Sequence, residues 1–331
     1  MIPYQCQCGQ PLFCENTRCG ACGRDTAFEP LTNTMLSLDR NGEDWVDVNG
    51  RTYRPCANRR EYNACNGVVD RYDENSLCSG CRLNRTIPMI NRSENLLRWK
   101  RLEAAKRRMI AGVSKLGLNV NTGMRFDFLE DRRSHPEVQE HFVATGHKDG
   151  VITVNVLEAD ELELVKQREM MGERYRTVLG HLRHEAGHFF YPALIGNVDA
   201  FRARFGDPFA DYGAALSRYY EAGPPENWQA LYISRYASSH PLEDWAECFA
   251  HLLHIEDTLE TAVSYGFVDE PGKDTRDKLQ TWARFAVPLN ELSRSLGQRD
   301  PYPFILTETV IQKLQFVADA ITAYRDNTAA A

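Results

Sequence analysis

The chain has 331 residues, of which 43% are hydrophobic and 26% are charged, as in an ordinary folded globular protein. Its formal net charge is -7, so the chain as a whole is not suited to bind nucleic acid or an anionic membrane. The sequence contains no apolar run of about 18 residues, the length that a membrane-spanning helix requires. The first residues lack the basic and apolar regions of a secretory signal, and we therefore expect a cytoplasmic protein.

Nine of the ten cysteines lie in the first 81 residues. Two pairs, Cys19 with Cys22 and Cys78 with Cys81, have the C-x-x-C spacing of zinc knuckles. Without a secretory signal, this spacing favours metal ligation over disulfides. The same segment shows little apolar periodicity and needs a metal to stabilise its fold. We predict that residues 1–90 form a zinc-ribbon region.

A structural zinc site of this kind takes four thiolates in a closed tetrahedron. One predicted set is Cys56, Cys65, Cys78 and Cys81. The preferred second set is Cys6, Cys8, Cys19 and Cys22. Only one residue separates Cys6 from Cys8, so Cys14 stays open as an alternative ligand. We expect two structural zinc ions here, and the preferred further role of the region is to dock a protein partner.

Apolar residues recur at helical spacing from about residue 91, and Ser93 is the predicted N-cap of a helix that ends near Gly117. Residues 98–108 of this helix carry six bases and one acid. A basic helix of this kind is usually a solvated face, although it can also bind an acidic partner.

Two strands are predicted next, at 126–129 and at 151–156, where apolar and polar residues alternate. A turn over 147–150 precedes the second strand. A long helix then begins near Tyr175 and should end before Pro192, because proline cannot continue the helical hydrogen bonds.

Residues 197–240 are interrupted by proline and glycine and are predicted to be irregular. A helix is expected from Pro241 to about Asp257, and the chain beyond it is mostly helical. Its last helix presents one apolar face, made of Val310, Leu314, Val317 and Ile321. We predict one domain over 91–325 and a loose C-terminal tail over 326–331.

The five residues His184-Glu185-Ala186-Gly187-His188 match the pattern H-E-x-x-H. Residues i and i+4 share one face of a helix, so both imidazoles can reach one metal ion. Glu185 then lies beside the metal, where it can take a proton from an activated water and pass it to a leaving amine. Apolar flanks predict a buried helix, and two buried His and a buried Glu without a metal would be costly.

A catalytic zinc takes a third protein ligand and keeps one position open. No ligand residue lies three or six positions after His188, so the third ligand must come from elsewhere. Glu243, Glu247 and His251 form one stripe along the later helix, and both acids are candidates.

Three neighbouring residues have plainer interpretations. His240 precedes a proline and is expected in a turn, whereas His181 is expected to be packed or exposed rather than to support the site. Cys248 is predicted to be a small buried apolar residue.

The sequence resembles the bacterial family of zinc-binding metallopeptidases that carry an N-terminal zinc ribbon. The resemblance covers nearly the whole chain and is most specific at residues 181–188, 233–241 and 243–247. It implies an α+β, zincin-like (gluzincin-type) domain that is mostly helical with a small sheet. It also implies a peptidase acting on a peptide or protein substrate.

The second motif is also similar to the catalytic domain of anthrax lethal factor, in the order and spacing of Tyr236, Glu243, Trp245, Ala246 and Glu247. This resemblance implies that Glu243 is the third zinc ligand and that Glu247 orients a ligand histidine. It implies that Tyr236 stabilises the oxyanion of the tetrahedral intermediate. Asp244 departs from the pattern, which has an aromatic residue there.

We therefore predict peptide hydrolysis at one catalytic zinc, held by His184, His188 and Glu243, with Glu185 as general base and acid. The alternative is a zinc-stabilised regulatory module that binds protein or nucleic acid and whose peptidase site is silent or gated. The strand Val151–Val156 is either an edge that pairs with an extended substrate or a plain sheet strand.

Overall fold

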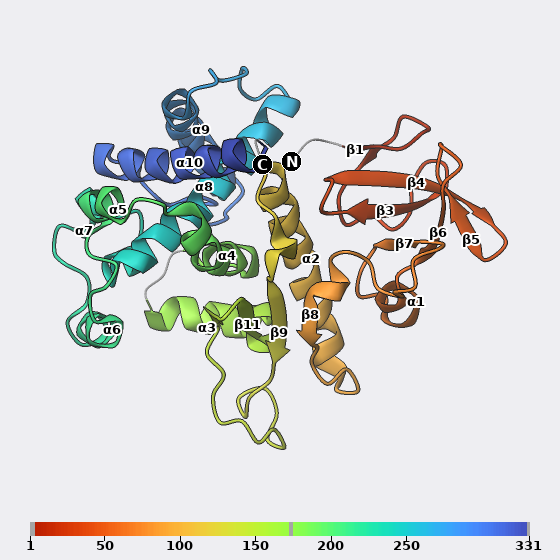
Figure 1. Ribbon diagram of the computed structural model, residues 1–331, viewed down its shortest axis with the longest axis horizontal. Coiled ribbons are helices and arrows are strands. Elements are labelled where there is room, and N and C mark those ends of the chain that lie inside the picture. The colour runs from red at the N-terminus through yellow and green to blue at the C-terminus, as the bar shows by residue number, and fades with distance from the viewer. Residues whose placement is uncertain (1–3, 172–174, 330–331) are drawn as a thin grey trace. The chain divides into compact units, whose positions relative to one another are not determined.

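The computed structural model describes residues 4–171 and 175–329 (Figure 1). It has the mixed helix and sheet composition that the sequence predicts, with close to half of the chain in helices. The chain divides into two compact units, Ile2–Gln167 and Arg168–Ala331. No helix of the described residues is long and apolar enough to cross a bilayer.

The N-terminal unit begins with two antiparallel sheets. The first pairs β1 (Tyr4–Gln5) with β2 (Pro11–Leu12). The second is a meander in sequence order, formed by β3 (Asp25–Glu29), β4 (Thr34–Asn41), β5 (Asp44–Val46), β6 (Thr52–Pro55) and β7 (Val68–Asp70). Its apolar core is small, consisting of Ala27, Leu38, Trp45 and Val68. A core of this size supplies little stability, which leaves a stabilising role for bound metal.

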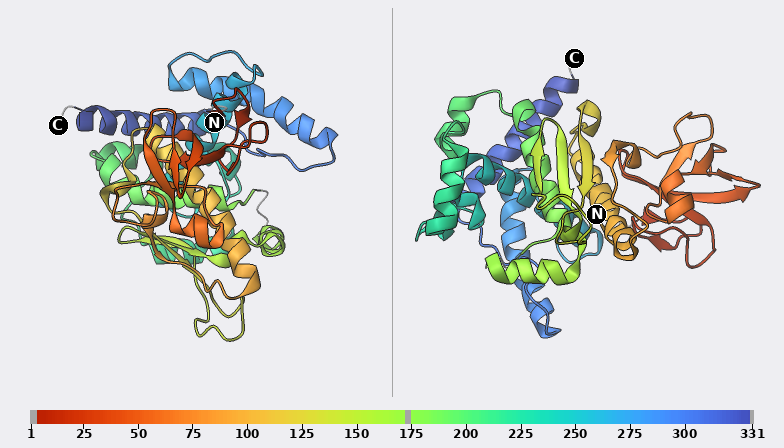
Figure 2. Two further views of the ribbon diagram at one scale, coloured as in Figure 1. Left: turned by 90° about the vertical axis from the view of Figure 1, so that its right-hand side faces the viewer. Right: turned by 90° about the horizontal axis from the view of Figure 1, so that it is seen from below.

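A four-stranded sheet follows in the same unit, in the order β10-β11-β9-β8. Its strands are β8 (Asn84–Thr86), β9 (Arg125–Leu129), β10 (Gly146–Lys148) and β11 (Val151–Asn155). The two predicted strands are confirmed as β9 and β11, which run parallel and lie side by side in the right-hand view of Figure 2. The unpredicted β10 forms a hairpin with β11, turning at Asp149 and Gly150, whose φ angles are 49° and 81°.

The position of β11 excludes one sequence-based hypothesis. The strand is bonded to β10 on one side and to β9 on the other, so it has no free edge. An extended substrate cannot pair with a strand whose backbone groups are already bonded. The interpretation of this segment as a substrate-binding edge is therefore wrong, and it is a plain sheet strand.

Two helices complete the N-terminal unit, α1 (Ala57–Tyr62) and α2 (Ser93–Lys115). The cap position of α2 is Arg92, one residue before the predicted cap. The helix ends as expected before Gly117, whose φ of 82° suits a residue without a side chain. A 3₁₀ turn, η3 (Val156–Ala159), packs against α2.

The basic stretch of α2 is not a solvated face, and this prediction is wrong. Arg98 pairs with Asp160 at 2.8 Å and Arg101 pairs with Glu161 at 2.7 Å. Lys106 is fully buried, and its ammonium lies 2.9 Å from the equally buried carboxylate of Glu103. These three positive charges are therefore paired with carboxylates of the same unit.

The remaining helices are α3 (Glu161–Met171), α4 (Val178–Leu194), α5 (Val198–Phe205), α6 (Tyr212–Ala222), α7 (Trp228–Leu231), α8 (Pro241–Ser264), α9 (Thr275–Ser295) and α10 (Glu308–Ala329). The start of α8 is confirmed, but the helix continues past Asp257. The apolar face of α10 is confirmed, because Val310, Leu314, Val317 and Ile321 are all buried. Because α10 reaches Ala329, the expected loose tail is helical over 326–329, and residues 330–331 lie outside the described residues.

Two sequence-based predictions about the C-terminal unit, Arg168–Ala331, are wrong, because proline and glycine did not end or prevent helices there. Pro192 lies inside the last turn of α4, and the helix continues two residues past it to Leu194 although proline lacks a backbone donor. Residues 197–240 are not irregular, since they contain α5, α6 and α7. Side chains cap two of these short helices: Asn197 accepts from the amides of Asp199 and Ala200, and Asp211 accepts from the amide of Ala214.

Candidate metal centre

Helices α4 and α8 bring together the three residues predicted to bind the catalytic metal. His184 and His188 lie one turn apart on α4, with their Nε2 atoms 3.1 Å from each other. Glu243, in the first turn of α8, places Oε2 3.0 Å from Nε2 of His184 and Oε1 3.3 Å from Nε2 of His188. The ligand atoms of all three residues lie within 4.8 Å of one another.

A close approach of the two helices makes this convergence geometrically feasible. A Cβ atom built on Gly187 would lie 3.0 Å from Cα of Ala246 and 3.1 Å from Cβ of Phe249. The buried indole of Trp245 donates a hydrogen bond to the carbonyl oxygen of Gly187 at 2.9 Å. The glycine inside the H-E-x-x-H motif is therefore the point at which α8 contacts α4.

Glu247 lies one turn after Glu243 but faces the other nitrogen of the same histidine. Its Oε1 is 2.8 Å from Nδ1 of His184, and its Oε2 accepts a hydrogen bond from the hydroxyl of Ser234 at 2.5 Å. Ser234 in turn accepts from the amide of Ala237 at 3.0 Å. Glu247 is thus outside the group of three converging ligand atoms.

The electrostatics of the centre are those of a buried, charged cluster. Burial opposes charge on His184, but the carboxylates of Glu243 and Glu247 raise its pKa well above the ordinary value. Burial also opposes charge on Glu243, yet His184 and His188 lower its pKa well below the ordinary value. The same balance lowers the pKa of Glu247 to about 2, so both acids carry negative charge at neutral pH.

The donor chemistry fits a zinc ion. A carboxylate facing Nδ1 of His184 holds the proton on that nitrogen, so that a metal ion displaces the proton on Nε2 and bonds to the lone pair there. Nε2 of His184, Nε2 of His188 and the carboxylate of Glu243 then point at one another. Two imidazoles and one carboxylate are a donor set that catalytic zinc sites use.

The other predicted catalytic residues lie around the same cluster. Glu185 is buried, with Oε1 3.6 Å from Nε2 of His181. Tyr236 lies in a 3₁₀ turn, η4 (Tyr236–Ser238), and its ring centroid is 5.9 Å from that of His184. Burial and the charge of Glu243 raise the pKa of Tyr236, so its hydroxyl stays protonated at neutral pH.

Sequence reasoning missed Tyr212, the first residue of α6. Its hydroxyl donates a hydrogen bond to Oε1 of Glu243 at 2.7 Å. Burial and the nearby Glu243 carboxylate raise the pKa of Tyr212, which keeps the hydroxyl a donor. No local pattern marks this residue, because its partner is far along the chain.

Two further histidines near the site have other partners. His240 caps α8 by accepting from the amide of Leu242 at 3.1 Å, as expected of a turn residue. Nδ1 of His251 lies 2.9 Å from the hydroxyl of Tyr302, and burial lowers the pKa of this histidine to about 4. Cys248 is fully buried, as predicted.

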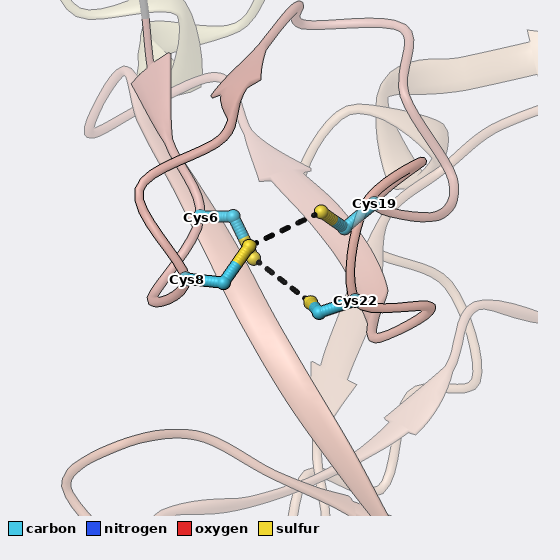
Figure 3. Close-up of side chains that lie close together, drawn as sticks. All are labelled: Cys6, Cys8, Cys19 and Cys22. Atoms are coloured by element: carbon cyan, nitrogen blue, oxygen red, sulfur yellow. Dashed lines mark hydrogen bonds between the residues drawn. The ribbon is translucent and has the colours of Figure 1, made fainter.

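The N-terminal unit contains two groups of four cysteines. In the first, Sγ of Cys6 is 3.5 Å from Sγ of Cys22, and Sγ of Cys8 is 3.7 Å from Sγ of Cys19 (Figure 3). All four sulfur atoms lie within 4.8 Å of one another. Cys14 is buried outside this group, and burial raises the pKa of its thiol to about 12, which disfavours the thiolate that zinc requires.

The second group is entirely buried and consists of Cys56, Cys65, Cys78 and Cys81. Gly67 lies against it, because a Cβ there would come within 2.6 Å of Sγ of Cys78. The thiol of Cys81 also faces the carboxylate of Glu103 on α2 at 3.9 Å. Both groups have the four-thiolate composition of closed structural zinc sites.

Comparisons with known proteins agree with these two kinds of site. A family model described as "Putative zinc-binding metallo-peptidase" matches residues 95–320, and a zinc-ribbon domain model matches residues 3–92. The chain is 36% identical over 340 aligned positions to the uncharacterized proteins Rv2568c of Mycobacterium tuberculosis and Mb2598c of Mycobacterium bovis, covering 96% of this chain and 94% of each relative. No solved structure matches significantly. The chain therefore belongs to the zinc-binding metallo-peptidase family and carries a zinc-ribbon domain at its N-terminus.

Proposed function

We propose that the protein is a zincin-like (gluzincin-type) peptidase that hydrolyses peptide bonds at a zinc ion held by His184, His188 and Glu243. The observation that carries this proposal is the convergence of one nitrogen from each histidine and the Glu243 carboxylate within 4.8 Å. When bound there, zinc supplies a Lewis acid that polarises the scissile carbonyl and acidifies the attacking water. The protein's own residues then have to move protons and stabilise charge.

Glu185 is the proposed general base and acid. It follows His184 directly on α4, and its carboxylate is buried beside the metal ligands. From this position it takes a proton from the attacking water and returns it to the leaving amine.

Tyr236 is the proposed oxyanion donor, and Glu247 is the proposed positioning residue. The protonated hydroxyl of Tyr236 can donate to the negative oxygen that develops on the scissile carbonyl. Glu247 holds the ring of His184 through Nδ1, and Ser234 holds Glu247. This chain of hydrogen bonds fixes the direction of the His184 lone pair.

The remaining parts of the proposal concern the whole chain. Three zinc ions are expected, one catalytic and two in the cysteine groups, since the described residues offer three such clusters. We propose residues 1–90 as the structural zinc-ribbon region, which could dock a protein partner, and 91–325 as the catalytic domain. A peptide or protein is the proposed substrate and the cytoplasm is the proposed location.

The decisive test of function compares Glu185→Gln with wild type on a mixed peptide library. We expect wild type to cleave and the variant to lose about 10²–10⁴-fold in rate while keeping all of its zinc, because general acid-base catalysis contributes that much. Glu221→Gln is the matched control, since Glu221 is exposed on α6. A fully zinc-loaded wild type that cleaves nothing would favour the rival role, a zinc-stabilised protein- or nucleic-acid-binding regulatory module.

A further inference from the structure

Helix α6 contacts the candidate zinc ligand Glu243 through its first residue, Tyr212. Tyr212 occupies the first position of α6, and its hydroxyl lies 2.7 Å from Oε1 of Glu243. Glu243 is almost fully buried, with an exposed fraction of 1%. A buried carboxylate requires hydrogen-bond donors for both oxygens, and Tyr212 supplies one of them.

Contacts around the start of α6 fix the orientation of the Tyr212 side chain. Asp211 caps the helix by accepting from the amide of Ala214 at 2.9 Å. The ring of His240 packs edge-on against Tyr212, with 5.1 Å between centroids, and Nε2 of His240 lies 3.0 Å from the carbonyl oxygen of Ala210. Because His240 is also the cap of α8, the starts of the two helices are tied together, so Tyr212 is held over Glu243.

The two oxygens of Glu243 are therefore distinguished. Oε1 accepts from Tyr212 at 2.7 Å and lies 3.3 Å from Nε2 of His188, whereas Oε2 lies closer to its histidine, 3.0 Å from Nε2 of His184. A carboxylate with one oxygen held by a fixed donor cannot rotate freely, which favours ligation through the other oxygen. The substitution Tyr212→Phe keeps the aromatic ring and its packing but removes the hydrogen bond that restrains Glu243.

We propose that Tyr212 is a positioning residue that orients Glu243 for zinc binding. This inference rests on the proposed function, because it takes Glu243 to be the third zinc ligand. Tyr212 acts on the metal through Glu243 and is not itself a ligand. Sequence alone could not suggest this, since no motif joins Tyr212 to the H-E-x-x-H helix.

The test is a double-mutant cycle on the full chain, with Zn²⁺ alone titrated against a competing chelator. We expect Tyr212→Phe to weaken the histidine site by about 10–100-fold, the usual effect of losing a group that orients a ligand, and to leave the two cysteine sites unchanged. In a Glu243→Ala background the same change should have no further effect on zinc affinity. Tyr265→Phe, at the exposed far end of α8, is the matched control.

The outcomes separate this inference from the proposed function. Equal zinc affinity in wild type and Tyr212→Phe would overturn the positioning role. Equal weakening in both Glu243 backgrounds would also overturn it, because Tyr212 would then act on the fold and not through Glu243. If wild type binds no zinc at the histidines, the proposed function itself fails.

Discussion

At the scale of single residues, two glutamates one turn apart on α8 have different environments. Glu243 faces Nε2 of both histidines, whereas Glu247 faces Nδ1 of His184 only. We therefore propose Glu243 as the ligand of a zinc ion at Nε2, and Glu247 as the group that orients the ring of His184 through Nδ1. The side-chain directions favour Glu243 over Glu247, the two acids that the residue pattern left open.

This division predicts different losses of metal when each acid is removed. Glu243→Ala should leave two ligands and release zinc from the histidine site at micromolar concentrations. Glu247→Ala should keep the metal with an affinity lower by about 10–100-fold. Zinc content after gel filtration and chelator competition measure the two effects, and loss of metal in the Glu247 variant alone would reverse the assignment.

Part of the centre could be predicted because its pattern is local. His184, Glu185 and His188 share a helical spacing that a reader of the sequence can recognise. Tyr212 and Ser234 could not be predicted in this way, because each contacts a glutamate that lies on another element, 31 and 13 residues further along the chain. Hydrogen bonds between distant residues depend on tertiary packing, which the sequence pattern does not encode.

At the scale of elements, the glycine between the two histidines sets the distance between α4 and α8. A side chain at position 187 would press on Ala246 and Phe249, so the backbone of Ala246 would have to shift by a few tenths of an ångström. The third ligand is on α8, so any separation of the helices should also move Glu243 away from the histidines.

We predict that Gly187→Ala lowers stability by about 1–3 kcal/mol, the usual cost of overpacking a core, and weakens zinc binding at the histidine site. Gly196→Ala is the control, because a Cβ at Gly196 meets nothing within 4 Å. Urea unfolding and chelator competition measure both quantities. Equal behaviour of the two variants would show that the helices can adjust without cost.

The polar cluster inside the N-terminal unit is a second element-scale feature. Glu103 is fully buried and accepts hydrogen bonds from Asn84 at 2.6 Å, Trp99 at 3.2 Å and Lys106 at 2.9 Å. Burial raises the pKa of Glu103, which opposes the stabilising charge of Lys106. Cys81 of the second four-cysteine group faces the same carboxylate, with its sulfur 3.9 Å from Oε2 of Glu103.

We predict that Lys106→Met destabilises this unit by about 3–5 kcal/mol, because it removes the cation closest to a buried carboxylate and leaves only Arg107, at 3.9 Å. The double variant Glu103→Leu with Lys106→Met should recover much of that loss, since it removes both charges. Lys100→Met, a change of the same kind elsewhere on α2, is the control. Circular dichroism in urea measures all three, and a Lys106 variant as stable as the control would contradict the account.

The basic residues of α2 show why charge counting failed here. Six bases in eleven positions suggest a surface feature, but their acidic partners are distant in sequence. Asp160 and Glu161 follow the four-stranded sheet, and Glu15 lies in the zinc ribbon, where it pairs with Arg108. A one-dimensional pattern cannot distinguish an exposed base from one that is paired across the fold.

At the scale of the whole molecule, the sequence predicts the composition of the fold better than its connections. The mixed helix and sheet content, the N-terminal ribbon and the helix carrying H-E-x-x-H are confirmed. The strand order β10-β11-β9-β8 could not be predicted, because β8 joins the sheet from before α2. The helices of 197–240 were missed because proline and glycine mark their ends and not an absence of structure.

The central claim is that the chain holds three zinc ions, one of them at a separate histidine site. The most direct measurement is zinc per chain by elemental analysis, on wild type and on a His184→Ala/His188→Ala variant of the full chain. We predict a fall from about three zinc ions to about two, because the two four-cysteine groups remain intact. An unchanged count would contradict the account, since the H-E-x-x-H helix would then hold no metal, and the chain would be a zinc-stabilised binding module.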